Sequence, residues 1–396
     1  MRRAALFLTF ALALAGGARA QSSGIRAWTA LYGETYSFDG GYLIDTVAVD
    51  RVSQVTVPLG VTVPLGAAGR FGGITLSGGY SYVDVRPVDP ASPSQSISTL
   101  LDTELRFSWN AIPGRLVVFA NGAIPTGTHT VASQELSTLV LVATDVIGFA
   151  TSNLGTGGAL GGGVAGAFPL GESWALGVGG SVRGNFSYTV IEGDSAQLNP
   201  GTDLRLRGGI EGPLARRTYL RAAVTWARRS VDQAQDLTAD SSGSLNRIGD
   251  RFIGYLSLDH GIGNSVLNLY AFDVFRTDPQ LEATVIGAAI LPRGNLLGAG
   301  ARFDWRFNRS MALVPKFEYR LSLIAERPEA GSTADNTLQL FGESFRVGAD
   351  WRYRFARRWN LVVQAEAAFG RLVQEVDGER VNFGGPRAAL HVEWTP

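Results

Sequence analysis

The side chains that most often carry catalytic chemistry are scarce in this chain of 396 residues. It has no cysteine and only three histidines, His129, His260 and His391, which excludes thiolate metal sites, thiol nucleophiles and disulfides. Only His129 has candidate partners nearby, namely Ser133, Glu135 and Asp145. A hydrolase needs its nucleophile and base within hydrogen-bond reach, and this spacing enforces no such contact. We therefore expect a solvated loop histidine and no enzyme, with a surface hydrolase as the minor alternative.

Signals for nucleotide, metal or nucleic-acid binding are weak. Basic and acidic residues number 35 each, so the net charge is zero and no nucleic-acid partner is expected. The glycine-rich run 155–163 contains a dinucleotide-like spacing, but neither an amphipathic helix nor a strand–helix–strand unit follows it. Glycine in a strand more often lets neighbouring groups approach closely. We expect no cofactor and no metal.

The charged residues lie at alternate positions of long segments. In residues 101–110, apolar side chains occupy one face of a strand and charged side chains occupy the other. The same alternation recurs in 174–189, 297–307, 313–323 and 345–355. The residues of the charged face are predicted to line a lumen, and the principal ones are Asp102, Glu104, Arg106, Arg183, Arg205, Arg207, Arg302, Asp304, Arg306, Lys316, Glu318, Arg320, Arg346, Asp350 and Arg352.

Two folds produce such two-faced strands. A soluble β-sandwich turns the apolar face inward, whereas a membrane barrel turns it toward lipid. The segments run to about ten residues or more, against a usual soluble length of about 5–6. Tryptophans also lie near their ends on the apolar face, as interfacial girdles do. We therefore expect an all-β protein, a transmembrane antiparallel up-and-down β-barrel.

The connections predict the number of strands. Seven short turns alternate with eight longer polar segments, which gives about 16 strands with both termini on the same side. The range is 14 to 18, because residues 283–291 in the sixth long loop are apolar enough to pair as a strand. The short turns, expected to face the periplasm, are predicted at 64–70, 112–115, 169–173, 213–217, 261–264, 308–310 and 356–358.

The first twenty residues are typical of an export signal. Met1-Arg2-Arg3 supplies a positive start, residues 4–15 are apolar, and Ala18-Arg19-Ala20 fits a cleavage site. The apolar run is shorter than the roughly 20 residues of a membrane-spanning helix. We expect residues 1–20 to be removed, which leaves residues 21–396 as one barrel domain in the cell outer membrane.

On these features the chain resembles Gram-negative outer-membrane β-barrels of the porin type. Leu390, Val392 and Trp394 alternate at the end of the chain, similar to the C-terminal strand that the barrel-assembly machinery reads, although Thr395-Pro396 replaces a terminal aromatic residue. The resemblance implies that this machinery, outer-membrane lipid and lipopolysaccharide are partners. The oligomeric state stays open.

A weaker resemblance concerns residues 121–127. Their Pro-Thr-Gly ending is similar to a strand end in FadL-like and phenol-pathway transport barrels. A channel for hydrophobic compounds is therefore one alternative. FadL-type transporters carry an N-terminal plug, and a first strand that begins near Gly24 leaves no room for one.

The charged face indicates a pore. An Arg or Lys facing lipid at the membrane midplane costs about 2–4 kcal/mol, so these charges must line an aqueous or ion-paired interior. Side chains do not fill a barrel of about 16 strands. We expect passive diffusion of small polar solutes, with a preference for anions because basic residues outnumber acidic ones on this face. A non-conducting structural or adhesin barrel, with its interior charges paired, is the other alternative.

The longest connection, 126–156, is a candidate constriction. It is apolar over 136–142, so burial should fold it against the barrel, either inward across the lumen or outward onto lipid or a partner subunit. The third loop of sixteen-stranded porins folds inward, and the resemblance suggests the same here. His129, Glu135 and Asp145 are the predicted constriction groups. The alternative is that 136–142 forms a short strand or helix that extends the wall.

Overall fold

The structure is a computed structural model of the whole chain. It describes residues 24–44, 47–66, 69–236, 241–245, 247–280, 293–325, 337–374 and 378–395. The predicted signal peptide, residues 1–20, and the apolar stretch 283–291 lie outside the described residues. Among the described residues, no helix has the length and apolar character needed to cross a membrane.

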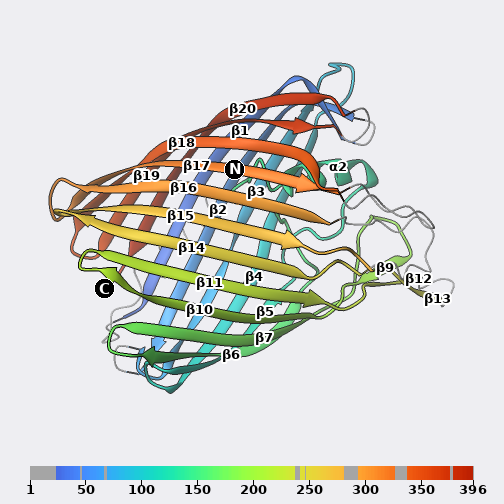
Figure 1. Cartoon of the computed structure of the whole chain (residues 1–396). Coiled ribbons are helices and arrows are strands. Elements are labelled where there is room, and N and C mark those ends of the chain that lie inside the picture. Colours follow the sequence, from blue (N-terminus) through green and yellow to red (C-terminus); the bar gives the residue numbers. More distant parts are fainter. Residues whose placement is uncertain are drawn as a thin grey trace.

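Sixteen antiparallel strands of the described residues close into one barrel (Figure 1). Each strand pairs with the next one along the barrel, and the last strand pairs back with the first. The predicted all-β up-and-down barrel of about 16 strands is confirmed. The strands are β1 (Arg26–Ile44), β2 (Val47–Leu65), β3 (Gly72–Pro87), β4 (Gln95–Ile112), β5 (Leu116–Ile124), β6 (Ala159–Leu170), β7 (Trp174–Asn185), β10 (Asp203–Ala215), β11 (Thr218–Arg229), β14 (Arg251–Ile262), β15 (Ser265–Arg276), β16 (Gly294–Arg306), β17 (Met311–Ile324), β18 (Gln339–Ala356), β19 (Trp359–Val373) and β20 (Arg380–Trp394).

The seven predicted short turns all join strands at one end of the barrel (Figure 1). The sequence predicts the first of the eight longer polar segments at 37–45, and this is wrong, because β1 continues to Ile44 and β2 begins at Val47. Gly40 and Gly41 adopt positive φ angles of 76° and 91°, and the register with β2 shifts between Ser37 and Tyr42. Glycine tolerates this conformation, so a turn-like sequence is accommodated as an irregularity inside a strand.

Two long connections fold into a separate small sheet at the other end. It consists of β8 (Tyr188–Thr189), β9 (Ala196–Asn199), β12 (Gln233–Asp236) and β13 (Ser241–Ser244), in the order β13-β12-β9-β8. Figure 1 shows β9, β12 and β13 beyond the ends of the barrel strands. We call this the outer sheet. The polar sequence of these segments predicts only loops.

The outer face of the barrel carries exposed apolar side chains. Phe107, Trp109, Leu206, Trp305 and Phe355 are all exposed, and each lies at an alternate position of its strand. Large apolar side chains are not stable in this number against water, whereas lipid accommodates them. The structure therefore has the belt of a transmembrane barrel, as the alternation predicts.

The alternation breaks at one place that matters for the lumen. Ser77 of β3 pairs with Glu104 of β4, but Gly79 of β3 pairs with Leu101 of β4. β4 therefore has one extra residue between these two pairs, which forms a bulge. Because a one-residue shift reverses the faces of a strand, Leu101 points inward and packs against the buried core. The sequence places Leu101 on the lipid face, and the bulge makes that placement wrong.

Candidate functional site

The connection from β5 to β6, residues 125–158, folds into the barrel, and we call it the lumen loop. It contains a short 3-10 helix, η2 (Ser133–Glu135), followed by α2 (Leu136–Val142), which Figure 1 shows at the end of the barrel opposite the short turns. Leu141 and Ile147 are fully buried. Of the two predicted directions, the loop takes the inward one, and its apolar run forms a helix and not a strand of the wall.

Apolar side chains of the lumen loop build a core with one side of the barrel. The ring of Phe149 meets Tyr36 edge-on, with centroids 5.2 Å apart. The wall side of this core comes from inward positions of β1 to β4, β19 and β20. Burial of this kind stabilises by about 25 cal/mol per Å² of apolar surface removed from water. The core residues are Tyr36, Phe38, Tyr42, Ile44, Val49, Val52, Val83, Val85, Ile97, Val131, Leu141, Val142, Val146, Ile147, Phe149, Leu154, Ala368, Leu372, Val381 and Phe383.

Polar side chains of β17 and β18 bind the backbone of the lumen loop. Arg346 donates through Nη2 to the carbonyl oxygens of Ile147 and Gly148, the latter at 2.6 Å. Ser344 donates to the carbonyl of Val146 at 2.7 Å. Hydrogen bonds from a charged donor are stronger than neutral ones. The positive charge of Arg346 therefore binds the backbone of the lumen loop and is not free to bind a solute.

The opposite edge of the lumen loop is held by β1 and β2. The Glu34 carboxylate accepts the Ala150 N–H at 2.6 Å. The Gln54 side-chain amide donates to the carbonyl of Thr151 at 2.8 Å and accepts its N–H at 3.3 Å. Glu34 is also bound to Arg387 at 3.2 Å. The loop is thus fixed to the wall on both sides by buried polar groups, which are costly to leave unpaired.

Asp102 joins the two ends of the lumen loop. Its carboxylate accepts the N–H of Gly127 at 3.0 Å and the N–H of Thr156 at 2.7 Å. The Thr156 hydroxyl donates to the same carboxylate at 2.8 Å. Asp102 lies in the bulge of β4, which places it beside the loop ends. Its role in the structure is to close the base of the loop.

The connection between β8 and β9 of the outer sheet forms hydrogen bonds with the lumen loop. Val131 donates to the carbonyl of Val190 at 3.0 Å, and its own carbonyl accepts the N–H of Glu192 at 2.8 Å. His129 meets the ring of Tyr188 edge-on at 5.5 Å. Burial raises the pKa of the Tyr188 hydroxyl, which keeps it neutral at physiological pH. The segment that carries β8 is therefore in direct contact with the lumen loop.

The three predicted constriction groups lie apart from one another. His129 has Nδ1 3.1 Å from the carbonyl oxygen of Gly127. Glu135 accepts the N–H of Ala132 at 3.1 Å and so caps η2. Asp145 is exposed, and its backbone carbonyl accepts a hydrogen bond from Arg320 at 2.9 Å.

No contact among the described residues joins His129 to Ser133, Glu135 or Asp145. The histidine, serine and carboxylates of the minor hydrolase hypothesis are therefore not assembled into a site.

The two sides of the lumen differ in their exposure to water. Beneath the lumen loop, inward side chains such as Val52 and Val83 are fully buried. On β10 and β11, the inward side chains of Arg205, Glu211 and Arg221 are about half exposed, at 50%, 49% and 49%. A residue that faces the inside of a closed barrel is exposed only if the inside holds water there. We call the surface formed by the inward faces of β4 to β7, β10 and β11 the open wall.

Many of the predicted lumen charges are paired. Lys316 forms salt bridges with Asp350 at 2.6 Å and with Glu366. Arg320 is bound to Glu318 at 2.8 Å. Partly buried groups need such partners because water no longer solvates them fully. Lys316, Glu318, Arg320 and Glu366 line a small cavity of about 210 Å³ beside the lumen loop.

Other basic residues have no acidic partner. Arg106, Arg183, Arg207 and Arg302 form no salt bridge with another described residue. The guanidinium of Arg106 lies 4.7 Å from the ring of Phe119, and that of Arg302 lies 4.9 Å from the ring of Tyr270. Three of these four arginines belong to the open wall, so unpaired positive charge faces its water.

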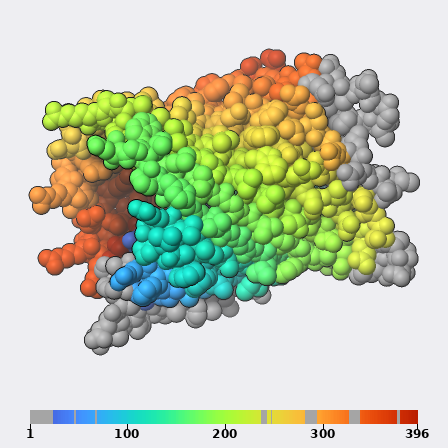
Figure 2. Space-filling view, turned by 60° about the horizontal axis from the view of Figure 1, so that its bottom comes forward, coloured from blue at the N-terminus to red at the C-terminus, as the bar shows by residue number. Residues whose placement is uncertain are grey.

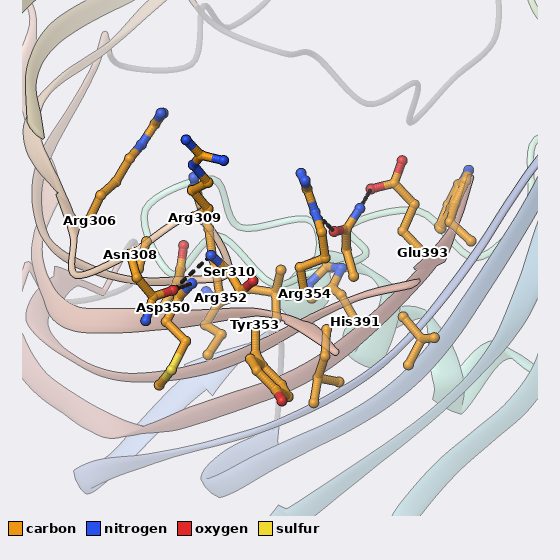
Figure 3. Close-up of a pocket in the computed structure, with 18 of the residues that line it drawn as sticks. Arg306, Asn308, Arg309, Ser310, Asp350, Arg352, Tyr353, Arg354, His391 and Glu393 are labelled. Carbon is orange, nitrogen blue, oxygen red and sulfur yellow. Dashed lines mark hydrogen bonds between the residues drawn. The ribbon is translucent and has the colours of Figure 1, made fainter. Parts of the chain in front are cut away.

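The end of the lumen beside the short turns is a vestibule of about 1120 Å³. Figure 2 shows this end of the barrel hollowed, and Figure 3 shows the residues around it. The Asp304 carboxylate binds Arg306 at 3.1 Å and Arg352 at 3.4 Å. Arg354 donates to the Asn360 side chain at 3.3 Å. Basic groups outnumber acidic groups along this lining, so the mouth of the lumen is positive.

The sequence missed the residues that hold the lumen loop. Glu34 and Gln54 are buried polar residues at inward positions next to Tyr36 and Val52, and Ser344 is a buried polar residue two positions before Arg346. Their signal was present in the alternation, because an inward polar residue among buried apolar ones needs a buried partner. No group of three or more His, Asp or Glu side chains that could hold a metal ion occurs among the described residues.

A closed antiparallel barrel with an apolar outer belt and a charged interior defines the class of transmembrane β-barrels. No family model matches the sequence, and no curated protein matches it.

Three solved structures resemble the barrel at low sequence identity. OpdQ of Pseudomonas aeruginosa shares 11% identity over 94% of this chain and 99% of its own, with a TM-score of 0.43. OccK5 (OpdH) of the same organism shares 10% over 94% and 97%, with a TM-score of 0.44. The outer membrane channel DcaP of Acinetobacter baumannii shares 12% over 96% and 99%, with a TM-score of 0.39. The predicted barrel fold is confirmed by the closed 16-strand sheet of the described residues itself.

Proposed function

We propose that the protein is an outer-membrane pore for the passive diffusion of small polar solutes. The observation that carries the proposal is the open wall, where charged side chains that face the inside of the barrel are exposed. The lumen loop occupies the opposite side and so narrows the passage without filling it. No cofactor is required, because diffusion through a water-filled passage needs only the passage and its charges.

Two other functions fit the geometry less well. A FadL-like channel for hydrophobic compounds would need an apolar path, whereas the open wall presents Arg205, Arg207 and Glu211 to water. A non-conducting structural or adhesin barrel would need a filled interior. The core of the lumen loop covers the wall of β1 to β4, β19 and β20 and leaves β10 and β11 exposed.

The cellular setting belongs to the same proposal. We infer that residues 1–20 direct export and that the barrel inserts among outer-membrane lipid and lipopolysaccharide. Trp394 of β20 pairs with Ala27 of β1, which closes the barrel. The strand that the barrel-assembly machinery would read is therefore also the strand that completes the fold.

The pore is expected to prefer anions. Arg106, Arg183 and Arg207 face the open wall without acidic partners among the described residues, and the vestibule is also basic. Lumen charges of one sign concentrate the opposite ion. In a planar bilayer under a KCl gradient, the reversal potential should show chloride preference. The double variant Arg205→Glu/Arg207→Glu should lose or reverse that preference.

A matched control separates lumen charge from total charge. Arg216 is exposed in the short turn between β10 and β11, so Arg216→Glu should leave the reversal potential nearly unchanged. At about 1 M salt, where the screening length is about 3 Å, all these differences should shrink. Cation preference of the unaltered protein would contradict the proposed selectivity.

A further inference from the structure

A recess is set into the open wall, away from the lumen loop. It has a volume of about 390 Å³ and lies between β4, β5, β7 and β10. Pockets that enclose small ligands usually measure about 300–1,000 Å³. The charged residues of its lining are Arg106, Arg183, Arg205, Glu104 and Asp203.

Two glycines of β6 lie between strand positions whose side chains line the recess. Gly161 pairs with Asn121 on one side and with Arg183 on the other. Gly163 pairs in the same way with Phe119 and Ser181. Paired residues share a face of the sheet, so the strand between these lining side chains contributes only backbone.

A side chain at Gly163 would have no room. A Cβ added there would collide with the Gly180 carbonyl oxygen and lie 2.7 Å from both the Phe119 ring and the Ser181 Cβ, closer than real contacts allow. The glycine run 155–163, which looks like a dinucleotide motif in the sequence, here lets neighbouring strands and side chains approach closely. Phe119 and Ser181, which line the recess, therefore lie close to each other across β6.

The arginines around the recess have unused donors. Arg205 is 3.9 Å from Asp203, too far for a strong hydrogen bond. Arg106 lies against the ring of Phe119. The Nε of Arg183 is shielded from water and has no hydrogen-bond partner among the described residues. A shielded donor without a partner is costly, and a bound acceptor would satisfy it.

The balance of charge selects the kind of acceptor. Three arginines face two carboxylates, Glu104 and Asp203, so the recess carries one net positive charge. A monoanion fits this balance, whereas a doubly charged phosphate would also meet repulsion from the two carboxylates. Guanidinium groups recognise carboxylates through paired hydrogen bonds.

The neutral lining groups select the rest of the ligand. Asn121, Ser77 and Ser181 also line the recess, and their amide and hydroxyl groups can donate to or accept from an alcohol. We propose that the recess is a binding site for a small polyhydroxylated carboxylate, such as a sugar acid. The inference deepens the proposed pore function, because it names the class of solute that the open wall would bind on its passage.

Gluconate is a suitable probe, and glucose is its uncharged counterpart. In titration calorimetry of the full barrel in detergent, gluconate should bind saturably, while glucose should bind at least tenfold more weakly. Arg183→Gln should weaken gluconate binding at least tenfold. Arg216→Gln removes the same charge from an exposed turn and should leave the affinity within twofold.

Retained β-sheet circular dichroism shows which variants are folded, and Arg106→Gln provides a second charge variant of the recess. Equal binding of gluconate and glucose, or unchanged gluconate binding in folded Arg183→Gln and Arg106→Gln, would overturn the recess as a carboxylate site.

Bilayer recording separates this inference from the pore itself. Gluconate should reduce chloride current with the same half-saturating concentration as in calorimetry, and Arg183→Gln should raise that concentration. A chloride current that gluconate and glucose affect equally would refute the recess and leave the pore standing. Gluconate binding without any current would refute the pore and leave the recess standing.

Discussion

Deletion of residues 136–149 should at least double the single-channel conductance of the barrel. These residues include α2 and the buried side chains of Ile147 and Phe149, which occupy one side of the lumen. Conductance rises with the open cross-section of a water-filled pore. Sixteen barrel strands remain after the deletion, so the wall is expected to stay closed. Single-channel recording of the refolded variant in a planar bilayer provides the measurement.

The matched control is a deletion in the outer sheet. Residues 233–244 contain β12 and β13, which pair outside the barrel, so their removal should leave the conductance nearly unchanged. A smaller change, Arg346→Met, removes the donor to Ile147 and Gly148 and should give an intermediate, noisier current. An unchanged conductance in a folded 136–149 deletion would show that the lumen loop does not limit the passage.

Single cysteines should divide the inside of the barrel into a reactive wall and a protected wall. The chain has no cysteine of its own, so each introduced thiol is unique. Arg207→Cys lies on the open wall and should react rapidly with a charged, water-soluble thiol reagent. Val52→Cys lies beneath the lumen loop and should react more slowly by orders of magnitude, because local opening must come first.

Mass spectrometry after timed labelling measures both rates. The same Val52→Cys substitution in the 136–149 deletion should become as reactive as Arg207→Cys, since the covering segment is gone. Similar reactivity of the two cysteines in the intact barrel would contradict the division into two walls.

The barrel was predictable from the sequence because its signals are local. Period-two alternation over residues such as 345–355 indicates which face of a strand meets lipid. Short turns such as 356–358 indicate where each hairpin turns. Features that depend on partners elsewhere were harder to predict. Leu101 changes face only because a bulge interrupts its pairing with β3, and Gly40 and Gly41 resemble a turn although they remain within a strand.

The site was predictable only in part. The apolar character of 136–142 correctly predicts burial of the lumen loop, because an apolar run is unstable in water. Which wall it meets depends on contacts between residues far apart in sequence, such as Arg346 with Gly148 and Glu34 with Ala150. Nothing in the sequence indicates such a partner for Arg346, which is therefore predicted as a free lumen charge.

The central claim, that water fills the lumen along the open wall, is tested most directly by single-channel current through the refolded full-length barrel. The protein is inserted into a planar bilayer in KCl, and the heat-unfolded protein serves as the control. The account predicts discrete insertion steps, each followed by a steady current proportional to voltage. A barrel that is folded and inserted in the membrane, yet carries no steady current, would contradict it.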